Sequence, residues 1–252
     1  MRLAQKGAKV VLGARSTTRL EAVAAEIRDL GGSALIQPTD VTDPKQCVAL
    51  IHRGLSEFGR LDMLINNAGI SMRALVDEVE TKTLRQVMEV NFWGTVNCTK
   101  AALPYLRESH GVLAAVSSVA GFHGLPGRSG YSASKFAIHG FLESIRIENL
   151  DVGLQVTIVA PGFTASEIRT HALLADGARQ GSTPLNEKAL MSPDRVGRII
   201  VRAIARGKRN RIISVEAQII ALMQRILPRW VDRMIFKNMA GEPESPLKNR
   251  HQ

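Results

Sequence analysis

Residues 112–135 have the sequence VLAAVSSVAGFHGLPGRSGYSASK: an apolar run, a glycine-rich loop and the start of a helix. Val112 to Val116 is short, continuous and apolar, which predicts a strand buried on both faces. The helix predicted from Tyr131 to Leu150 follows the loop. A buried strand followed by a helix is half of a βαβ unit, so this stretch predicts a parallel sheet.

The same alternation extends on both sides. Further strands are predicted at Lys9–Leu12, Ala34–Ile36, Leu61–Ile65, Leu154–Val159 and Arg211–Val215, and further helices at Thr17–Leu30, Asp43–Phe58 and Thr83–Ser109. Apolar strands at βαβ spacing indicate an α/β fold, a doubly wound, Rossmann-like parallel sheet in a single domain. We assign residues 1–215 to this domain and 216–252 to a basic, amphipathic helical extension and tail.

Composition narrows the class of protein. The chain has 252 residues, of which 45% are hydrophobic and 22% charged, as in soluble globular proteins. Cys47 and Cys98 are the only cysteines, too few for a disulfide framework or a zinc ribbon, so we expect a cytoplasmic protein without a structural metal. The beginning of the sequence lacks the apolar region of a signal peptide, and no apolar run is long enough to span a membrane.

The net charge of +10 is unevenly placed. From Met191 onward there are 13 Lys and Arg residues but 5 Asp and Glu residues, so most of the excess lies in the last quarter. Ile219 to Phe236 carries a broad apolar stripe at helical spacing, with Arg225, Arg229 and Arg233 on the other side. Pro228 must kink or split this helix.

Two interpretations of the basic extension stay open. It packs on the body or on a partner subunit with a solvated basic face, or it lies on an anionic membrane surface. Nucleic acid is not an expected partner, because no recognised binding motif accompanies the charge.

Polar or turn-forming residues follow five predicted strands. They are Arg15, Asp40, Asn66–Gly69, Ser117–Ser118 and Pro161–Gly162. Each alone is compatible with a turn or a helix cap. Ligands of doubly wound sheets bind beyond the carboxyl ends of the strands, so five such ends together predict a binding site.

Tyr131 and Lys135 lie four residues apart on one helix and therefore share a face. A tyrosine has a pKa of about 10, and a nearby cation lowers it, which lets the phenol exchange protons near neutral pH. The pair alone is common on surfaces. Ser118, thirteen residues before Tyr131 at the end of a strand, adds a hydroxyl, and the two groups together can hold a carbonyl oxygen.

The motifs NNAG, VN, SS, YSASK and PG begin at Asn66, Val90, Ser117, Tyr131 and Pro161. In this order and spacing the chain resembles the short-chain dehydrogenase/reductase family, closely from Gly7 to Ile168. The resemblance implies that Tyr131 passes a proton to or from the substrate oxygen and that Ser118 polarises this oxygen. The family spacing favours Ser118 over Ser117. Lys135 would lower the tyrosine pKa and hold the ribose of a nicotinamide cofactor, and Asn91 would anchor a water in a proton relay.

The resemblance also implies a cofactor site. Its residues would be Asp40 and Val41 at the adenine, Asn67, Ala68 and Gly69 at the adenine ribose, Pro161 and Gly162 at the nicotinamide, and Ser166 near the carboxamide. In NAD-preferring relatives, the second strand of the family's sheet usually ends with an acidic residue. At the corresponding position this sequence has Ala14, followed by Arg15. An arginine suits a 2′-phosphate, so we expect NADP(H) rather than NAD(H). The alternative is that Arg15 is a solvated turn residue.

The family's first strand and its glycine-rich turn, which seats the pyrophosphate on a helix N-terminus, have no counterpart in this sequence. The missing strand would be central in the sheet. We hypothesise that the sequence is truncated at a misassigned start and that the longer product is the active enzyme. The alternative is a protein that kept the fold without the cofactor.

Residues near Tyr131 and Pro161 are expected to form the substrate site, namely Phe122, His123, Leu125 and Phe163. His123 is either a second acid–base group or an ordinary loop histidine. The polar stretch Phe163 to Leu190 is a candidate lid.

Together these features predict an NADP(H)-dependent oxidoreductase that interconverts a carbonyl and an alcohol on a hydrophobic or acyl-type small molecule. A homodimer or homotetramer is expected. The alternative function is a catalytically silent Rossmann-like binding protein without a functional cofactor site.

Overall fold

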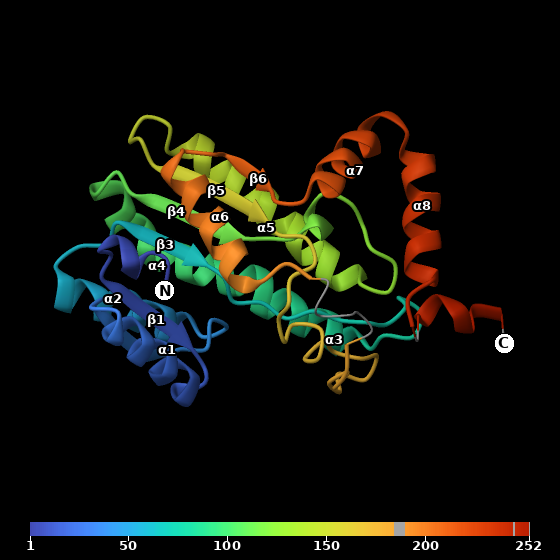
Figure 1. Cartoon of the computed structure of the whole chain (residues 1–252), viewed down its shortest axis with the longest axis horizontal. Coiled ribbons are helices and arrows are strands. Elements are labelled where there is room, and N and C mark those ends of the chain that lie inside the picture. Colours follow the sequence, from blue (N-terminus) through green and yellow to red (C-terminus); the bar gives the residue numbers. More distant parts are fainter. Residues whose placement is uncertain (184–189, 244, 252) are drawn as a thin grey trace.

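Apolar strands and helices alternate along the chain, as the sequence predicts (Figure 1). The computed structural model describes residues 1–183, 190–243 and 245–251. The strands are β1 (Val10–Ala14), β2 (Ala34–Pro38), β3 (Met63–Asn66), β4 (Val112–Val116), β5 (Gln155–Ala160) and β6 (Asn210–Ile212). The helices are α1 (Thr17–Asp29), α2 (Pro44–Phe58), α3 (Thr81–Met88), α4 (Gly94–Glu108), α5 (Ser129–Glu148), α6 (Pro193–Ala205), α7 (Val215–Ile226) and α8 (Pro228–Ala240).

All strand pairs are parallel, in two sheets of order β1-β2 and β3-β4-β5-β6. Helices cover both faces, which confirms the doubly wound, Rossmann-like architecture. In β5, Ile158 packs with α2, α4 and α5, whereas the next residue, Val159, faces α6. Within the described residues no ladder joins β1 to β3, so the predicted sheet is divided at this point.

Local signals set the element boundaries. Asp43 caps α2 by accepting a hydrogen bond from the Lys45 N–H, and Pro44 occupies the first helical position. Pro228 starts α8 directly after α7, so the helix predicted over Ile219 to Phe236 is split, as expected. None of the described helices is long and apolar enough to cross a membrane.

The helix predicted from Thr83 to Ser109 contains an irregularity. A π-helical turn, Glu89–Trp93, separates α3 from α4, and Asn91 in this turn is completely buried. Single π turns are frequent at functional sites because they reorient one side chain relative to the helix face. Here the turn places Asn91 beneath the carboxyl end of β3.

The hairpin of α7 and α8 extends from the end of the sheet (Figure 1). Three buried residues of α8, Val231, Ile235 and Met239, pack against Leu75 and Leu247. One side of α8 therefore packs on the body, as the first interpretation of the extension predicts.

Candidate active site

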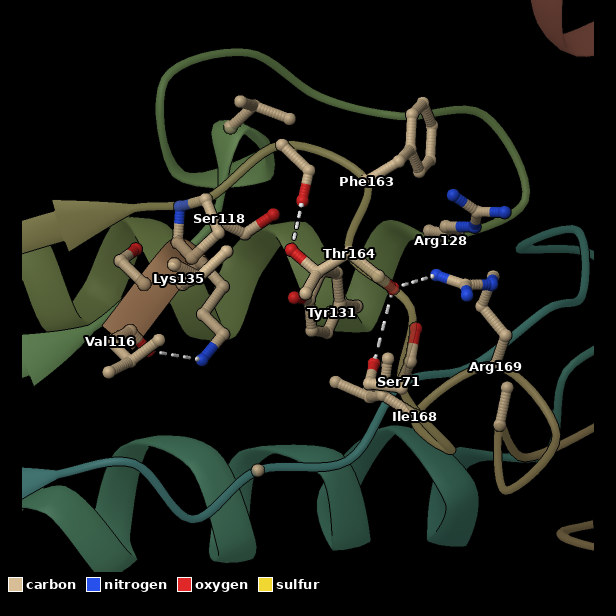
Figure 2. A pocket seen from close by; sticks show the side chains of 18 of the residues that line it. Ser71, Val116, Ser118, Arg128, Tyr131, Lys135, Phe163, Thr164, Ile168 and Arg169 are labelled. Atoms are coloured by element: carbon tan, nitrogen blue, oxygen red, sulfur yellow. Dashed lines mark hydrogen bonds between the residues drawn. The ribbon is translucent and has the colours of Figure 1, made fainter. Parts of the chain in front are cut away.

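A cavity of about 550 Å³ opens at the carboxyl ends of β3, β4 and β5 (Figure 2). This volume is typical of sites for small molecules. Ser118, Tyr131 and Lys135 line the cavity, so the structure brings together the three groups that the sequence places in the proton chemistry. Ser117 lines it as well.

Tyr131 lies in the first turn of α5 and is only 9% exposed. Burial raises the pKa of Tyr131, while a hydrogen bond with Ser118 and the charge of Arg128 lower it. Ser118 also accepts a hydrogen bond from the Ala120 N–H at 3.2 Å, which caps the short 3-10 helix that follows. The phenol is therefore held protonated at neutral pH and next to a hydroxyl.

The ammonium group of Lys135 donates a hydrogen bond to the Val116 carbonyl at 3.2 Å. It lies 5.7 Å from the centre of the Tyr131 ring. Burial lowers the pKa of Lys135 to about 8. The sequence predicts that Lys135 lowers the pKa of Tyr131. In the structure, Arg128 is the cation whose charge lowers this pKa. That role of Lys135 stays a prediction.

Asn91 braces the chain beyond β3. Its side chain accepts from the Ile70 N–H at 2.8 Å and donates to the Ile70 carbonyl at 2.9 Å and to Ser134 Oγ at 2.9 Å. A Cβ at Gly69 would lie 3.2 Å from Asn91 Oδ1 and 3.6 Å from Lys135 Nζ. Glycine at this position lets the backbone pass close to both side chains and leaves room in the cavity.

The cofactor residues predicted at the ends of β3 and β5 fall into one group. Those that line the cavity are Asn67, Gly69, Pro161, Gly162 and Ser166, and Ala68 is exposed beside them. Thr164 lines it too, and its hydroxyl donates to the Gly162 carbonyl at 3.1 Å. Gly69 and Gly162 leave backbone room at the cavity, and Lys135 offers hydrogen-bond donors there, so these residues are compatible with a dinucleotide cofactor.

The cofactor residues predicted at the ends of β1 and β2 lie outside this cavity. Arg15 is exposed directly after β1. Asp40 accepts hydrogen bonds from the Thr42 N–H at 3.0 Å and hydroxyl at 2.8 Å, so it shapes its own turn. The Val41 carbonyl accepts from Asn97 Nδ2 at 3.0 Å.

The predicted substrate residues divide into two pairs. Leu125 and Phe163 line the cavity. The placement of Phe122 and His123 there is corrected, because neither lines it. The 3-10 turn capped by Ser118 directs Phe122 onto the His139 ring, edge-on at 4.6 Å, and buries His123. Part of the predicted lid, residues 184–189, lies outside the described residues.

Several residues of the site escaped the sequence prediction. Arg73, Arg128 and Arg169 line the cavity, although they are far apart in the chain. Arg128 had a detectable signal, because it stands three residues before Tyr131 at the start of the same helix. Arg73 and Arg169 have none, since only the folded chain brings them to the site.

A partly buried pair lies at the edge of the site. Ser117 Oγ and His139 Nε2 are 2.7 Å apart. Burial, together with the charges of Lys135 and Arg146, lowers the pKa of His139 to about 4. The imidazole is therefore neutral at physiological pH.

Comparison with known proteins gives consistent matches. Residues 1–175 match the model of the family described as short chain dehydrogenase. The chain is 34% identical over 252 residues to 11-beta-hydroxysteroid dehydrogenase A of Sesamum indicum, which covers 96% of this chain and 72% of the relative. It is 32% identical to dehydrogenase/reductase SDR family member 7B of Rattus norvegicus, with 97% and 77% covered. A putative oxidoreductase, SadH of Mycobacterium tuberculosis, is 31% identical, with 95% and 89% covered.

Among solved structures, an alcohol dehydrogenase from the archaeon Thermococcus sibiricus complexed with 5-hydroxy-NADP superimposes with a TM-score of 0.72. It is 25% identical, and the match covers 84% of this chain and 86% of that one. Levodione reductase superimposes with a TM-score of 0.63 at 29% identity, with 65% of each chain covered.

Proposed function

Because the chain belongs to the short-chain dehydrogenase family of oxidoreductases, we propose that it interconverts a carbonyl and an alcohol with NADP(H) as its cofactor. The observation that supports this most is the convergence of Ser118, Tyr131 and Lys135 in one cavity beside Gly162. When bound, the cofactor supplies or accepts the hydride.

The chain's own groups manage the proton. Tyr131 would donate to the substrate oxygen, and Ser118 would hydrogen-bond the same oxygen as negative charge develops on it. Since burial keeps the Tyr131 phenol protonated at neutral pH, the site is prepared to donate a proton.

Lys135, Pro161 and Gly162 would hold the nicotinamide end of the cofactor, and Asn67, Ala68 and Gly69 would lie at the adenine ribose. We assign the 2′-phosphate to Arg15, whose guanidinium is exposed at the carboxyl end of β1. Support comes from the Thermococcus sibiricus neighbour, which is complexed with 5-hydroxy-NADP.

The extension has a second proposed role, contact with an anionic membrane surface. Ile219, Leu222 and Ile226 form one row on α7 and are 56%, 60% and 64% exposed, and Trp230 on α8 is 54% exposed. Four cations, Arg225, Arg229, Arg233 and Lys237, lie on the same hairpin. Apolar residues beside cations favour an anionic lipid interface. The competing proposal is that this face is covered by a second copy of the chain in a homodimer or homotetramer.

The test of the oxidoreductase function is direct. NADPH, NADP⁺ and NADH are titrated against the purified chain, and NADPH absorbance is followed with a panel of ketones and aldehydes. We expect NADPH binding and carbonyl-dependent oxidation that Tyr131→Phe abolishes. The catalytically silent alternative predicts no turnover with any carbonyl, and absence of both binding and turnover would overturn the proposal.

A further inference from the structure

The end of the cavity beyond Tyr131 is built from guanidinium groups. Arg73, Arg128 and Arg169, here called the arginine wall, all line the cavity, and each is only 8% exposed. Arg128 and Arg169 lie on the opposite side of Tyr131 from Lys135 (Figure 2). Among the described residues that line the cavity, none is Asp or Glu.

Within the part of the chain that the structure describes, one carboxylate lies close to two members of the arginine wall. Glu242, in the segment after α8, lies 3.5 Å from the nearest guanidinium nitrogen of Arg73 and 3.5 Å from that of Arg128. Arg73 also donates to the Pro243 carbonyl at 2.7 Å. One carboxylate neutralises one of the two guanidinium groups, so this trio keeps a positive charge.

A buried charge without a counter-charge is costly, because the cation has lost its hydration. Burial lowers the pKa of Arg128, the charge of Glu242 opposes this, and the positive charges of Arg73 and Arg169 lower the pKa further. Among the described residues, Arg128 shares its carboxylate partner, Glu242, with Arg73 at the cavity. Its planar fork of N–H donors matches the oxygens of a carboxylate or a phosphate.

We propose that the substrate carries an oxyanionic group, a carboxylate or a phosphate monoester, which binds the arginine wall while its carbonyl meets Tyr131. This inference rests on the proposed oxidoreductase function. Arg128 is the N-cap residue of α5 and Tyr131 lies in the first turn of the same helix, and both side chains line the cavity. The anionic group would lie on the arginine side of Tyr131, and Leu125 and Phe163 would receive the apolar remainder of the substrate.

The competing explanation is structural. In this explanation, Arg73 and Arg128 serve only to hold the segment after α8 in place, through their ion pairs with Glu242. The two explanations differ for Glu242→Gln, which breaks the fastening but leaves the guanidinium groups in place. Arg128→Gln removes one of the two ion pairs to Glu242 and one positive charge at the cavity.

The experiment uses the whole chain with matched substrates: straight-chain oxo acids, their methyl esters and a ketone phosphate monoester of similar length. The wild type is expected to favour the acid or the phosphate over the ester by about 10-fold or more in kcat/KM. Arg128→Gln should lower this ratio by about 10-fold or more, whereas Glu242→Gln should keep or raise it. Arg53→Gln, an exposed arginine on α2, is the control that keeps the ratio.

The outcomes separate the two proposals. If carbonyls turn over but acid and ester are used equally, the anionic substrate is refuted and the oxidoreductase function stands. If Arg128→Gln and Glu242→Gln affect acid and ester alike, the arginines only fasten the chain.

If no carbonyl turns over, binding of the oxo acid is measured by calorimetry. Binding that Arg128→Gln weakens would still support the arginine wall. Absence of that binding would refute it. Preference for the acid or for the phosphate identifies the oxyanion.

Discussion

The side-chain amide of Asn91 hydrogen-bonds both the N–H and the carbonyl of Ile70, at 2.8 and 2.9 Å. A residue of a π turn thereby fixes the strand extension that carries Gly69. The family resemblance predicts a water-anchoring role for Asn91. The geometry adds a role in shaping the cavity wall.

Asn91→Asp should destabilise the fold. The substitution removes the donor to Ile70 and Ser134 and places a carboxylate at a completely buried position, so we expect a loss of about 2–4 kcal/mol in the free energy of unfolding. Urea unfolding measures it. Asn97→Asp on α4 is the matched control, which loses one hydrogen bond to the Val41 carbonyl and should cost about 1 kcal/mol. Equal losses in the two variants would contradict the bracing role.

Tyr131→Phe should lower kcat by at least about 100-fold, because it removes the proton donor and leaves the ring in place. Ser118→Ala should cost about 100-fold through the lost hydrogen bond to the developing charge. Steady-state rates with NADPH measure both, and circular dichroism checks that the variants fold. A Tyr131→Phe variant that retains wild-type turnover would mean that another group donates the proton.

Cofactor preference should depend on Arg15. Arg15→Gln removes the proposed partner of the 2′-phosphate, so the ratio of kcat/KM for NADPH over NADH should fall by about 10- to 100-fold. The Arg53→Gln variant should keep the ratio. Were the wild type to prefer NADH, Arg15 would be a solvated turn residue, the alternative that its position in the sequence left open.

Stability should fall as the solution is acidified, in part through His139. Its pKa in the folded protein is about 4, below the ordinary value of about 6.5, so the unfolded chain binds the proton first as pH falls. The contribution is present above about pH 6.5 and is lost towards pH 4. Between pH 7 and pH 5 it amounts to about 2 kcal/mol.

His139→Gln should therefore flatten the pH dependence of unfolding by about that amount. The exposed His52, replaced in the same way, serves as the control. Parallel profiles for wild type and His139→Gln would show that the imidazole does not titrate in this window.

The hairpin of α7 and α8 should bind vesicles that contain anionic lipids, and binding should weaken with salt. Leu222→Asp and Trp230→Asp place charges on its exposed apolar face and should abolish binding in a sedimentation assay. Val76→Asp, at an apolar residue that is 66% exposed elsewhere, is the control. Loss of self-association on gel filtration in the first two variants, with no vesicle binding by the wild type, would assign the face to a subunit contact instead.

The elements of the fold were predictable because their signals are local. Apolar runs marked the strands, Asp43 and Pro44 marked the start of α2, and Pro228 marked the break between α7 and α8. The π turn at Asn91 was not predicted, since it preserves the apolar pattern of a continuous helix.

The candidate site was predictable where chemistry follows a strand end or a helical repeat, as for Ser118, Tyr131 and Lys135. It was not where contacts are long-range. Arg73 and Arg128 contact Glu242 only because the segment after α8 packs against the body, and no residue spacing in the sequence predicts these contacts. Phe122 was misplaced because a three-residue turn decides which way its side chain points.

The division between β1 and β3 has a consequence for how the molecule opens. β1, β2 and α1 are joined to the four-stranded sheet mainly by the packing of α2 on α4, and by no backbone ladder within the described residues. Parts of a fold can open locally at a lower free energy than global unfolding, and a pair of strands without ladder bonds to the main sheet is a candidate for such opening. Amide protons of Val10–Ala14 should then exchange with solvent sooner than those of Val112–Val116, whose strand is paired on both edges. The adenine end of the proposed site would lie on the less stable of the two units, and the proton chemistry on the more stable one.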